Sequence, residues 1–342
     1  MEDYKNNIYD RVIVNNHHDF IENDDNDVSA NYVILCEENT DSELPKAIYE
    51  YTISGLSLAE WVAMACESKP SYVTVYKGEK FLNSIKPYIG DKEYTVVLYA
   101  DTPLVSKTHL KDLLGFVSRK RLNVCKLKRG FILKNDYIAE VDEIYSSLVY
   151  DLSSNDFFEV KTFNDIDKVK GTLQRRMFNY HKKNGVIFES QENTIIDANV
   201  KIGYGSIIAG GVSLLQNTVI GKNVTIDANA VINNSKIEDN SKVSMGTIIE
   251  NSILKNNTSV GSGAIINYSV VGENVMIGVG TRVVSSALKN NSSVNNFSCL
   301  ENVNVLENAK VGKGSMIIGE GLTVAVEENS EVQSGTKIIK KN

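Results

Sequence analysis

An aliphatic residue returns at a short, regular interval through the C-terminal half of the chain, and this repeat restricts the fold more than any other feature. From Ile196 to Ile232 the interval is six residues, and from there to Ile317 one interval in three shortens to five. The series is Ile196, Ile202, Ile208, Leu214, Ile220, Ile226, Ile232, Ile237, Val243, Ile249, Leu254, Val260, Ile266, Val271, Ile277, Val283, Leu288, Val294, Leu300, Val305, Val311 and Ile317. Random placement would not produce it, so it predicts a repeat architecture.

Six residues suit one short strand and one corner, and three such units close a triangular coil whose strands stack in parallel on those of the next coil. The shortened interval recurs every 17 residues, so Ile237, Leu254 and Val271 should lie above one another. Gly, Asp or Asn often follows the aliphatic residue, as in Asp197 and Gly203, and these types suit tight corners. The pattern is typical of a left-handed parallel β-helix, here of about eight coils.

In the first half of the chain, strand and helix patterns alternate. We expect strands at 32–35, 72–76, 95–100, 123–127, 130–133 and 157–162, and helices at 57–68, 79–89, 106–121, 136–149 and 164–183. This order predicts an α/β domain built on an open, largely parallel sheet with helices on both faces. A short strand at 11–14 is expected within the polar, acidic N-terminal segment.

These patterns divide the chain into four parts. We expect a polar N-terminal segment at 1–30, an α/β domain at 31–163, a linking helix at 164–185 and the β-helix at 186–342. Gly185 follows the linking helix and is a suitable residue to end it.

Composition excludes several classes of partner and location. The net charge of −7 and the hydrophobic fraction of 42% are typical of a soluble globular protein and argue against nucleic acid or an anionic membrane as a partner. The basic clusters at 119–121 and 126–129 are expected to be solvated faces. The four cysteines lie far apart, and no apolar run approaches about 18 residues, so we expect a cytoplasmic protein without a disulfide framework or membrane span.

Three segments of the first half resemble the sugar-1-phosphate nucleotidyltransferases. The strand at 32–35, followed by Leu44-Pro45-Lys46, resembles the first strand of that family and the end of its nucleotide loop. The segment at 97–104, which contains Asp101, resembles the strand that carries a metal-binding aspartate. The segment at 162–165 and the helix after it resemble the part that carries a second metal ligand. With the hexapeptide repeat, the resemblance is closest to the bifunctional N-acetylglucosamine-1-phosphate uridylyltransferase/glucosamine-1-phosphate acetyltransferases.

The resemblance implies a role for three residues. Asp101 and Asn164 would hold Mg²⁺ through oxygen ligands, and Lys46 would contact phosphate oxygens in a transfer between two anions. Each residue also has an ordinary structural interpretation. An aspartate after a strand is often a turn residue, an asparagine before a helix is often a cap, and a lysine in a loop is usually solvated.

The nucleotide loop departs from the family pattern. In place of a glycine-rich loop with an arginine, the chain has a shorter segment at 36–43 that carries the four acidic residues Glu37, Glu38, Asp41 and Glu43. A carboxylate about 5 Å from a phosphate costs on the order of 3 kcal/mol at an effective dielectric constant of 20. The family's base-reading and sugar-binding motifs also have no counterpart, and the segment at 121–131 is too short for its sugar-binding lobe.

The acetyltransferase activity of the bifunctional relatives is not expected here. Such enzymes generally use a histidine on the coils or an inserted loop as the general base, but His17, His18, His109 and His181 all precede the β-helix. The resemblance also implies a homo-oligomer, with a trimer as the simplest form, because a prism of parallel coils presents flat faces for self-association.

Three functional hypotheses remain open. The first is a nucleotidyltransferase-like protein with an eroded nucleotide site and weak or no catalysis. The second is an active sugar-1-phosphate nucleotidyltransferase that makes a nucleotide sugar for the cell envelope. The third is a structural or regulatory scaffold. Whether the chain is an enzyme is therefore left open, with a nucleotide or sugar nucleotide as the expected ligand.

Overall fold

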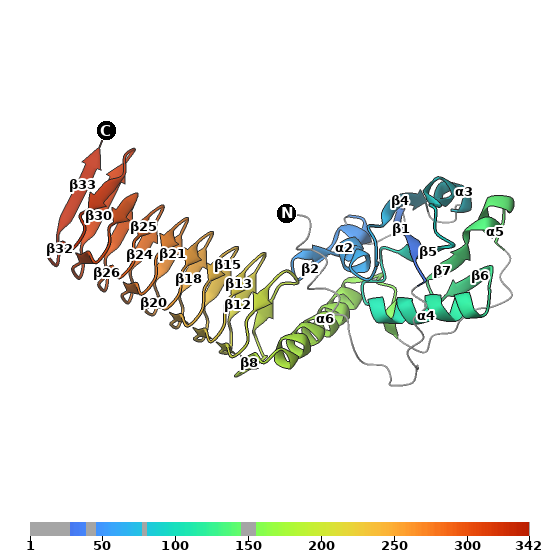
Figure 1. The fold of residues 1–342 in the computed structure, drawn as a ribbon, viewed down its shortest axis with the longest axis horizontal. Coiled ribbons are helices and arrows are strands. Elements are labelled where there is room, and N and C mark those ends of the chain that lie inside the picture. The colour runs from blue at the N-terminus through green and yellow to red at the C-terminus, as the bar shows by residue number, and fades with distance from the viewer. Residues whose placement is uncertain (1–27, 39–45, 77–80, 145–154, 342) are drawn as a thin grey trace. The chain divides into compact units, whose positions relative to one another are not determined.

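The protein consists of two compact units. The computed structural model describes residues 28–38, 46–76, 81–144 and 155–341. Its contacts separate Met1–Arg176, here called the α/β unit, from Met177–Asn342, here called the β-helix unit (Figure 1). Each unit has hydrophobic clusters of its own. The strand expected at 11–14 and most of the acidic segment at 36–43 lie outside the described residues.

The α/β unit contains short strands and helices in alternation. Its strands are β1 (Ala30–Glu38), β2 (Thr52–Ile53), β3 (Leu56–Ser57), β4 (Ser71–Tyr76), β5 (Tyr94–Tyr99), β6 (Val124–Leu127) and β7 (Gly130–Lys134). Its helices are α2 (Leu58–Ala63), α3 (Leu82–Ile85), α4 (Lys107–Arg119), α5 (Asn135–Glu140) and the beginning of α6 (Phe163–Lys183), with 3-10 turns at Ile48–Glu50, Lys86–Tyr88 and Asn155–Phe157.

The main sheet has the strand order β4-β1-β5-β7-β6. β1 pairs in parallel with β4 and β5, whereas β7 is antiparallel to both β5 and β6. The expected parallel sheet is therefore limited to three strands. The reason is the connection between β6 and β7: Leu127 pairs with Gly130 across a tight turn, and a chain that reverses so sharply can only pair in the antiparallel sense.

Helices cover both faces of this sheet, as the sequence predicts. Alternate residues of β1 point to opposite faces. Ile34 belongs to a cluster with residues of α2 and α4, whereas Val33 and Leu35 belong to a cluster with residues of α3 and α5. The middle parts of β1 and β5 are buried and apolar. Polar residues lie instead at the carboxyl ends of these two strands.

Local signals explain where two of the helices begin. Ser57 and Glu60 form a capping box at the start of α2, because the Ser57 hydroxyl accepts from the Glu60 backbone and the Glu60 carboxylate accepts from the Ser57 backbone. At α6 the cap is Thr162, whose hydroxyl accepts from the Asp165 backbone at 3.2 Å. The prediction that Asn164 and Asp165 cap this helix is therefore wrong for Asn164, which lies inside the first turn.

The strand predicted at 157–162 is wrong. Asn155–Phe157 forms a 3-10 turn, and the chain continues to α6 without pairing. Phe157 and Val160 are both buried, and the Val160 backbone donates to the Asp101 carbonyl at 2.9 Å. The apolar residues that suggested a strand instead fix a loop over the end of β5.

The β-helix unit consists of three parallel sheets. The first has eight strands: β10 (Lys201–Ile202), β13 (Val219–Ile220), β16 (Lys236–Ile237), β19 (Ile253–Leu254), β22 (Val270–Val271), β25 (Ala287–Leu288), β28 (Val303–Val305) and β31 (Val324–Val326). The second has nine: β8 (Ile187–Phe188), β11 (Ile207–Ile208), β14 (Thr225–Ile226), β17 (Lys242–Val243), β20 (Ser259–Val260), β23 (Met276–Ile277), β26 (Ser293–Val294), β29 (Lys310–Val311) and β32 (Glu331–Val332). The third also has nine: β9 (Ile195–Ile196), β12 (Ser213–Leu215), β15 (Val231–Asn233), β18 (Ile248–Glu250), β21 (Ile265–Asn267), β24 (Arg282–Val284), β27 (Cys299–Glu301), β30 (Met316–Glu320) and β33 (Lys337–Lys341).

This arrangement confirms the predicted fold class, an open α/β sheet followed by a left-handed parallel β-helix of hexapeptide repeats. Every residue of the aliphatic series is buried, and Leu254 pairs with Ile237 below it and Val271 above it. The expected number of about eight coils is slightly low, because two of the sheets have nine strands and the last strand ends at Lys341.

Asparagines at the corners explain how the coils turn without many glycines. Ten of them have φ between 53° and 59°, among them Asn223, Asn240, Asn257, Asn274, Asn291, Asn308 and Asn329. Asparagine tolerates this left-handed conformation better than most residues do. The side chains also bond along the stack, as where Asn257 Nδ2 donates to Asn274 Oδ1 at 3.1 Å.

No helix within the described part of the chain is long and apolar enough to cross a bilayer.

Candidate functional site

The candidate site lies at the carboxyl end of β5, where Asp101 follows the strand. The turn is held by two hydrogen bonds: Ala100 N donates to Leu35 O at 2.9 Å, and the Thr102 hydroxyl donates to Tyr99 O at 2.7 Å. Asp101 is only 6% exposed. The side chain that the resemblance assigns to a metal is thus fixed in a buried position beside the ends of two parallel strands.

Arg129 reaches this position from the turn between β6 and β7. Gly130 pairs with Leu98 on one side and Leu127 on the other, so the turn lies beside the end of β5. Gly130 has φ of +133°, and a Cβ atom there would lie 2.5 Å from Val97 O. Only glycine allows β7 to approach β5 this closely, and this approach sets where Arg129 begins.

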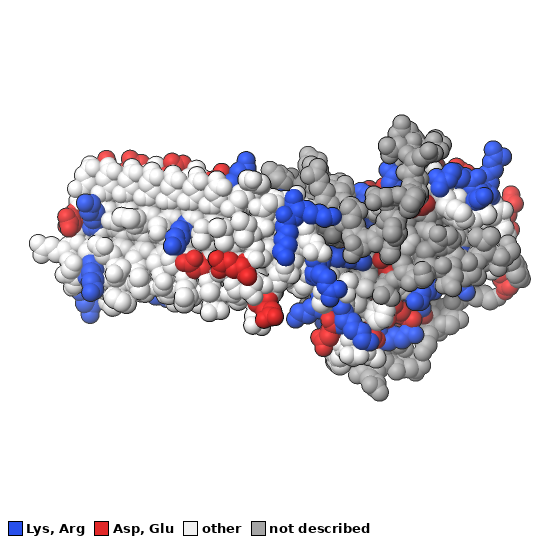
Figure 2. All heavy atoms as spheres, turned by 90° about the horizontal axis from the view of Figure 1, so that it is seen from below, with Lys and Arg blue, Asp and Glu red and all other residues white. Residues whose placement is uncertain are grey.

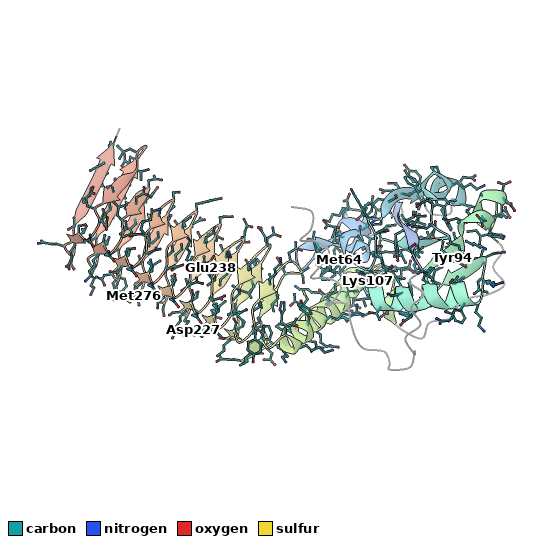
Figure 3. All side chains as sticks on the ribbon, viewed as in Figure 1. Met64, Tyr94, Lys107, Asp227, Glu238 and Met276 are labelled. Carbon is teal, nitrogen blue, oxygen red and sulfur yellow. The ribbon has the colours of Figure 1, made fainter. Side chains whose placement is uncertain are left out.

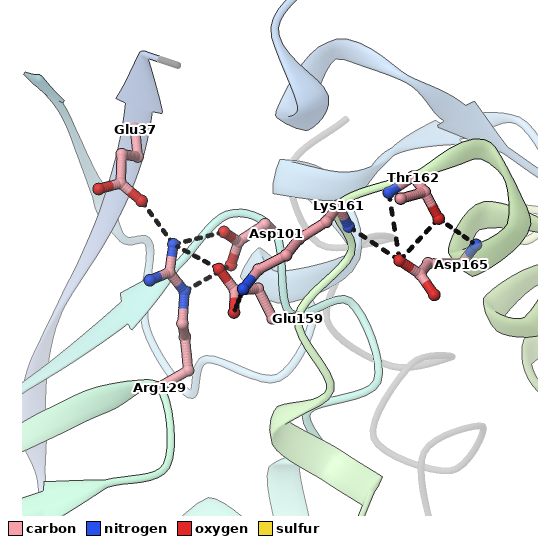
Figure 4. A network of polar contacts seen from close by, with 7 residues as sticks. All are labelled: Glu37, Asp101, Arg129, Glu159, Lys161, Thr162 and Asp165. Atoms are coloured by element: carbon pink, nitrogen blue, oxygen red, sulfur yellow. Dashed lines mark hydrogen bonds and ion pairs between the residues drawn. The ribbon is translucent and has the colours of Figure 1, made fainter. Parts of the chain in front are cut away.

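The guanidinium of Arg129 binds Asp101 through two parallel hydrogen bonds. Nε donates to Oδ1 at 3.2 Å and Nη2 donates to Oδ2 at 2.6 Å. Nη2 also donates to Glu37 Oε2 at 2.5 Å and lies 3.4 Å from Glu159 Oε1 (Figure 4). Lys161 Nζ lies 2.8 Å from the other oxygen of Glu159. We call these five residues the carboxylate–arginine cluster.

The part of the cluster around the guanidinium is largely shielded from water, whereas the Lys161 side chain is 66% exposed. The side chains of Arg129 and Glu37 are 20% and 24% exposed, and the guanidinium carbon lies 4.0 Å from the centre of the Tyr99 ring. A cation on an aromatic face in a partly desolvated position is held by the ring as well as by its anions. Three separate segments of the chain therefore converge on one arginine.

Burial and neighbouring charges together set the pKa values of Asp101 and Arg129. Burial raises the pKa of the Asp101 carboxyl above its ordinary value, although the bonds and charge of Arg129 oppose the shift. Burial would lower the pKa of Arg129, but the bonds and charges of Asp101, Glu37 and Glu159 outweigh it and raise the pKa. The guanidinium is therefore a permanent cation inside the cluster.

The residues present do not fit the Mg²⁺ ion that the resemblance implies. Both oxygens of Asp101 accept hydrogen bonds from Arg129. An ion that takes carboxylate oxygens at about 2.0–2.1 Å would have to share them with a guanidinium that carries the same sign of charge. Within the described ranges, no group of three or more His, Cys, Asp or Glu residues has a geometry suited to a metal ion.

Lys46 lies elsewhere and is exposed. Its Nζ donates to Glu50 O at 3.1 Å and lies 4.6 Å from the centre of the Tyr51 ring. Among the contacts of the described residues, none joins Lys46 to the carboxylate–arginine cluster. The assignment of Lys46 to a phosphate stays a prediction.

Asn164 is exposed on the first turn of α6. The neighbouring polar contacts belong to Asp165, whose carboxylate accepts from Thr162 N at 3.2 Å and from Thr162 Oγ1 at 2.9 Å (Figure 4). In the part of the chain that the structure describes, no hydrogen bond links Asn164 to Asp101. The structure thus brings Asp101 together with Arg129 rather than with the two other predicted site residues.

Sequence reasoning missed Arg129. The basic cluster at 126–129 was expected to be solvated, and Lys126 and Lys128 are indeed exposed, but the interpretation is wrong for Arg129. One signal was available: the two residues Lys128 and Arg129 separate the strands predicted at 123–127 and 130–133. A turn that short indicates a hairpin, and a hairpin beside β5 brings its tip to the end of that strand.

A second, half-buried network joins α4, the turn before α6 and α6 itself. Asp156 Oδ2 lies 2.5 Å from His109 Nδ1, and Asp156 Oδ1 lies 3.4 Å from Arg176 Nη2. Burial acts to raise the pKa of Asp156, but His109 and Arg176 outweigh it and lower the pKa. The hydroxyl of Ser106 accepts from His109 N as the cap of α4. The group resembles a serine–histidine–aspartate arrangement in composition, but these contacts give it a structural role.

His181 is a buried residue of α6 in the β-helix unit. It is 4% exposed, its ring centre lies 5.1 Å from that of Tyr180 and 6.5 Å from that of Phe188, and burial lowers its pKa to about 4. A buried imidazole packed against aromatic rings indicates a structural role for this residue.

Comparison with known proteins gives matches to parts of the chain. The family model described as the GMPPB C-terminal domain matches residues 190–277, which lie in the β-helix unit. The bifunctional protein GlmU of Listeria welshimeri is 40% identical over 76 residues, which are 22% of this chain and 17% of that protein. GlmU of Alkaliphilus oremlandii is 29% identical over 130 residues, which are 36% of this chain and 29% of that protein. The chain therefore spans less than a third of the length of these curated relatives.

Solved structures with a similar fold include a UDP-N-acetylglucosamine acyltransferase from Campylobacter jejuni. It is 17% identical, with a TM-score of 0.25, and the match covers 40% of this chain and 66% of that one. The corresponding enzyme of Francisella novicida is 17% identical with a TM-score of 0.29 over 40% of this chain and 62% of that one. The sequence matches support the resemblance to the sugar-1-phosphate nucleotidyltransferases, with GlmU among the relatives.

Proposed function

We propose that the chain is a sugar-1-phosphate nucleotidyltransferase-like protein, related to the UDP-N-acetylglucosamine pyrophosphorylases, whose nucleotide site supports weak catalysis or none. The observation that carries this proposal is the pair of hydrogen bonds from Arg129 to Asp101, at 3.2 and 2.6 Å. The carboxylate that the resemblance assigns to the metal already has a permanent cation as its partner.

The charge around the end of β1 supports the same proposal. A transfer between a triphosphate and a sugar phosphate brings two anions together, and it needs cations and backbone donors around the phosphates. Glu37 and Glu38 lie at the end of β1, and Glu37 is one of the partners of Arg129. One or two carboxylates near the phosphates would cost about 3–6 kcal/mol, which is at least about a hundredfold in affinity.

The decisive experiment is an assay of pyrophosphate release from UTP and N-acetylglucosamine 1-phosphate by the purified protein with Mg²⁺. We expect a rate close to background and UTP binding in the millimolar range or weaker, as an order of magnitude. Turnover of about 1 per second that Asp101→Ala abolishes would favour the alternative of an active enzyme.

The acetyltransferase activity is proposed to be absent. The chain's four histidines all precede residue 182, and the one in the β-helix unit, His181, is buried with a lowered pKa. An imidazole that cannot reach solvent cannot remove a proton from a substrate amine.

A structural contribution of the β-helix unit has support of its own. Outward apolar side chains are exposed on two of its sheets: Ile253 at 41% and Val270 at 47% lie on the neighbouring strands β19 and β22, and Met276 at 63% lies on β23 of another sheet (Figure 3). Uncharged atoms predominate on the β-helix face in Figure 2. Because exposed apolar patches favour association, we propose a homo-oligomer, most simply a trimer. Sedimentation that gives a monomer at micromolar concentration would contradict this part of the proposal.

The cytoplasm is the proposed compartment. Its support is that the four cysteines are all free, and Cys36 and Cys125 are buried. Free thiols are the usual state of cysteine in a reducing compartment.

A further inference from the structure

We infer that Arg129 takes the place of a divalent cation at Asp101, so that the α/β unit binds no metal ion there while this arginine is present. The inference rests on the proposed function only where it regards Asp101 as the counterpart of a metal ligand. It makes a statement about metal binding that is independent of any rate of catalysis.

The first argument is the number of oxygens that one guanidinium engages. Arg129 contacts both oxygens of Asp101, one oxygen of Glu37 and one oxygen of Glu159. These are the hard carboxylate ligands that Mg²⁺ or Mn²⁺ would need, and they come from β1, the turn after β5 and the segment before α6. The guanidinium thus occupies the carboxylate oxygens that a cation at Asp101 would use.

The second argument is the balance of charge. Asp101, Glu37 and Glu159 supply three carboxylates, and Arg129 and Lys161 supply two cations. Without Arg129, three carboxylates would remain opposite one lysine, whose ammonium group pairs with Glu159. Like charges in a partly buried site repel each other strongly, so the remaining carboxylates would recruit either protons or another cation.

The third argument is that Arg129 is held in position. The arginine follows a strand with a buried last residue, Leu127, and precedes Gly130, which is paired on both sides. The Tyr99 ring lies against one face of the guanidinium. A metal ion would therefore have to displace a side chain that is fixed by its backbone, an aromatic ring and three carboxylates.

The test is a titration of the full-length protein with Mn²⁺, followed by electron paramagnetic resonance, and with Tb³⁺, followed by luminescence excited through tyrosine. Tyr99 would sensitise a Tb³⁺ ion bound in place of the guanidinium, whose carbon lies 4.0 Å from the ring centre. Arg129→Met should gain a saturable site, at least about tenfold stronger in Mn²⁺ affinity than anything at this position in the wild type. The double variant Arg129→Met/Asp101→Asn should lose that gain.

Lys128→Met is the matched control, because Lys128 is the neighbouring residue of the same turn and is exposed. It removes the same charge and should behave like the wild type. An equal gain of metal binding in Lys128→Met and Arg129→Met would overturn the inference, and so would the absence of any gain in a folded Arg129→Met protein.

Wild type and Asp101→Asn decide the question if Arg129→Met does not fold. Metal binding that the wild type shows and Asp101→Asn lacks would overturn the inference, whereas identical titrations would support it. The pyrophosphate assay separates this outcome from the proposed function: Mg²⁺-dependent turnover would contradict the proposed function, and the titration alone would then decide whether Asp101 holds the ion.

Discussion

The β-helix unit repeats each core position at the same place in the next coil, whereas every element of the α/β unit has its own surroundings. Leu254 lies between Ile237 and Val271 in a column of aliphatic residues. Asp101 instead lies among residues of β1, the β6–β7 turn and the segment before α6. A repeated environment can be deduced from spacing alone, and a unique environment depends on which distant segments meet.

The largest effect is expected from a charge in the aliphatic column. Leu254→Asp would bury an unpaired carboxylate at a residue with 0% exposure, and we expect it to lower the free energy of unfolding by about 4 kcal/mol or more. Ile253→Asp is the matched control, because Ile253 precedes Leu254 on β19 and is 41% exposed. Ile253→Asp should lower the free energy of unfolding by no more than about 1 kcal/mol, measured by urea denaturation followed by circular dichroism. Equal losses in the two variants would break the predicted alternation.

The next effect is a dependence of stability on pH that arises from His181. Burial lowers the pKa of this histidine from 6.5 to about 4 in the folded protein. Between pH 6.5 and 4 the imidazole is protonated in the unfolded chain but not in the folded one. Its contribution to stability is therefore fully present above pH 6.5 and is lost as the pH falls towards 4. The loss should reach about 3 kcal/mol at pH 4.

His181→Leu should flatten this part of the profile while keeping the apolar contact with Phe188. The measurement is the urea midpoint of the β-sheet signal at several pH values between 7 and 4 (~1 unit apart). An unchanged slope in the variant would show that another group causes the pH dependence.

The smallest of the three effects concerns the hairpin that places Arg129. Gly130→Ala puts a Cβ atom 2.5 Å from Val97 O at a φ of +133°. We expect this clash and strain to lower the free energy of unfolding by about 2 kcal/mol, measured by thermal or urea unfolding. Gly171→Ala is the control, because a Cβ atom there meets nothing within 4 Å on α6. The free energy of unfolding of Gly171→Ala should rise by up to about 1 kcal/mol, because alanine has a higher helix propensity than glycine. A neutral Gly130→Ala would mean that β7 can move away from β5.

Most of the fold could be predicted from the sequence because its signals are local. The interval of the aliphatic series follows from the number of residues in one strand and one corner, and Ser57 and Glu60 form a capping box within one turn of helix. The wrong strand at 157–162 shows where such signals fail. Phe157 and Val160 are buried in a loop over the end of β5, and apolar residues in a short segment do not by themselves distinguish such a loop from a strand.

The candidate site could be predicted only in part. Asp101 was assigned through the resemblance of the segment at 97–104 to the family's metal-binding strand, and its place directly after a buried strand is a local feature. Its partner Arg129 is 28 residues further along the chain and Glu37 is 92 residues from that arginine. The short turn at 128–129 predicts a hairpin, but the basic cluster alone does not indicate that Arg129 becomes half-buried while Lys126 and Lys128 stay exposed.

The sequence by itself therefore determined the repeat, the buried aliphatic columns, the presence of an α/β unit and the position of Asp101 at the end of a strand. Only the tertiary structure decided that the cation beside Asp101 is an arginine of the same chain. The physical reason is distance along the chain: periodic burial is a property of neighbouring residues, whereas an ion pair between β5 and the β6–β7 turn exists only after the sheet has brought them together.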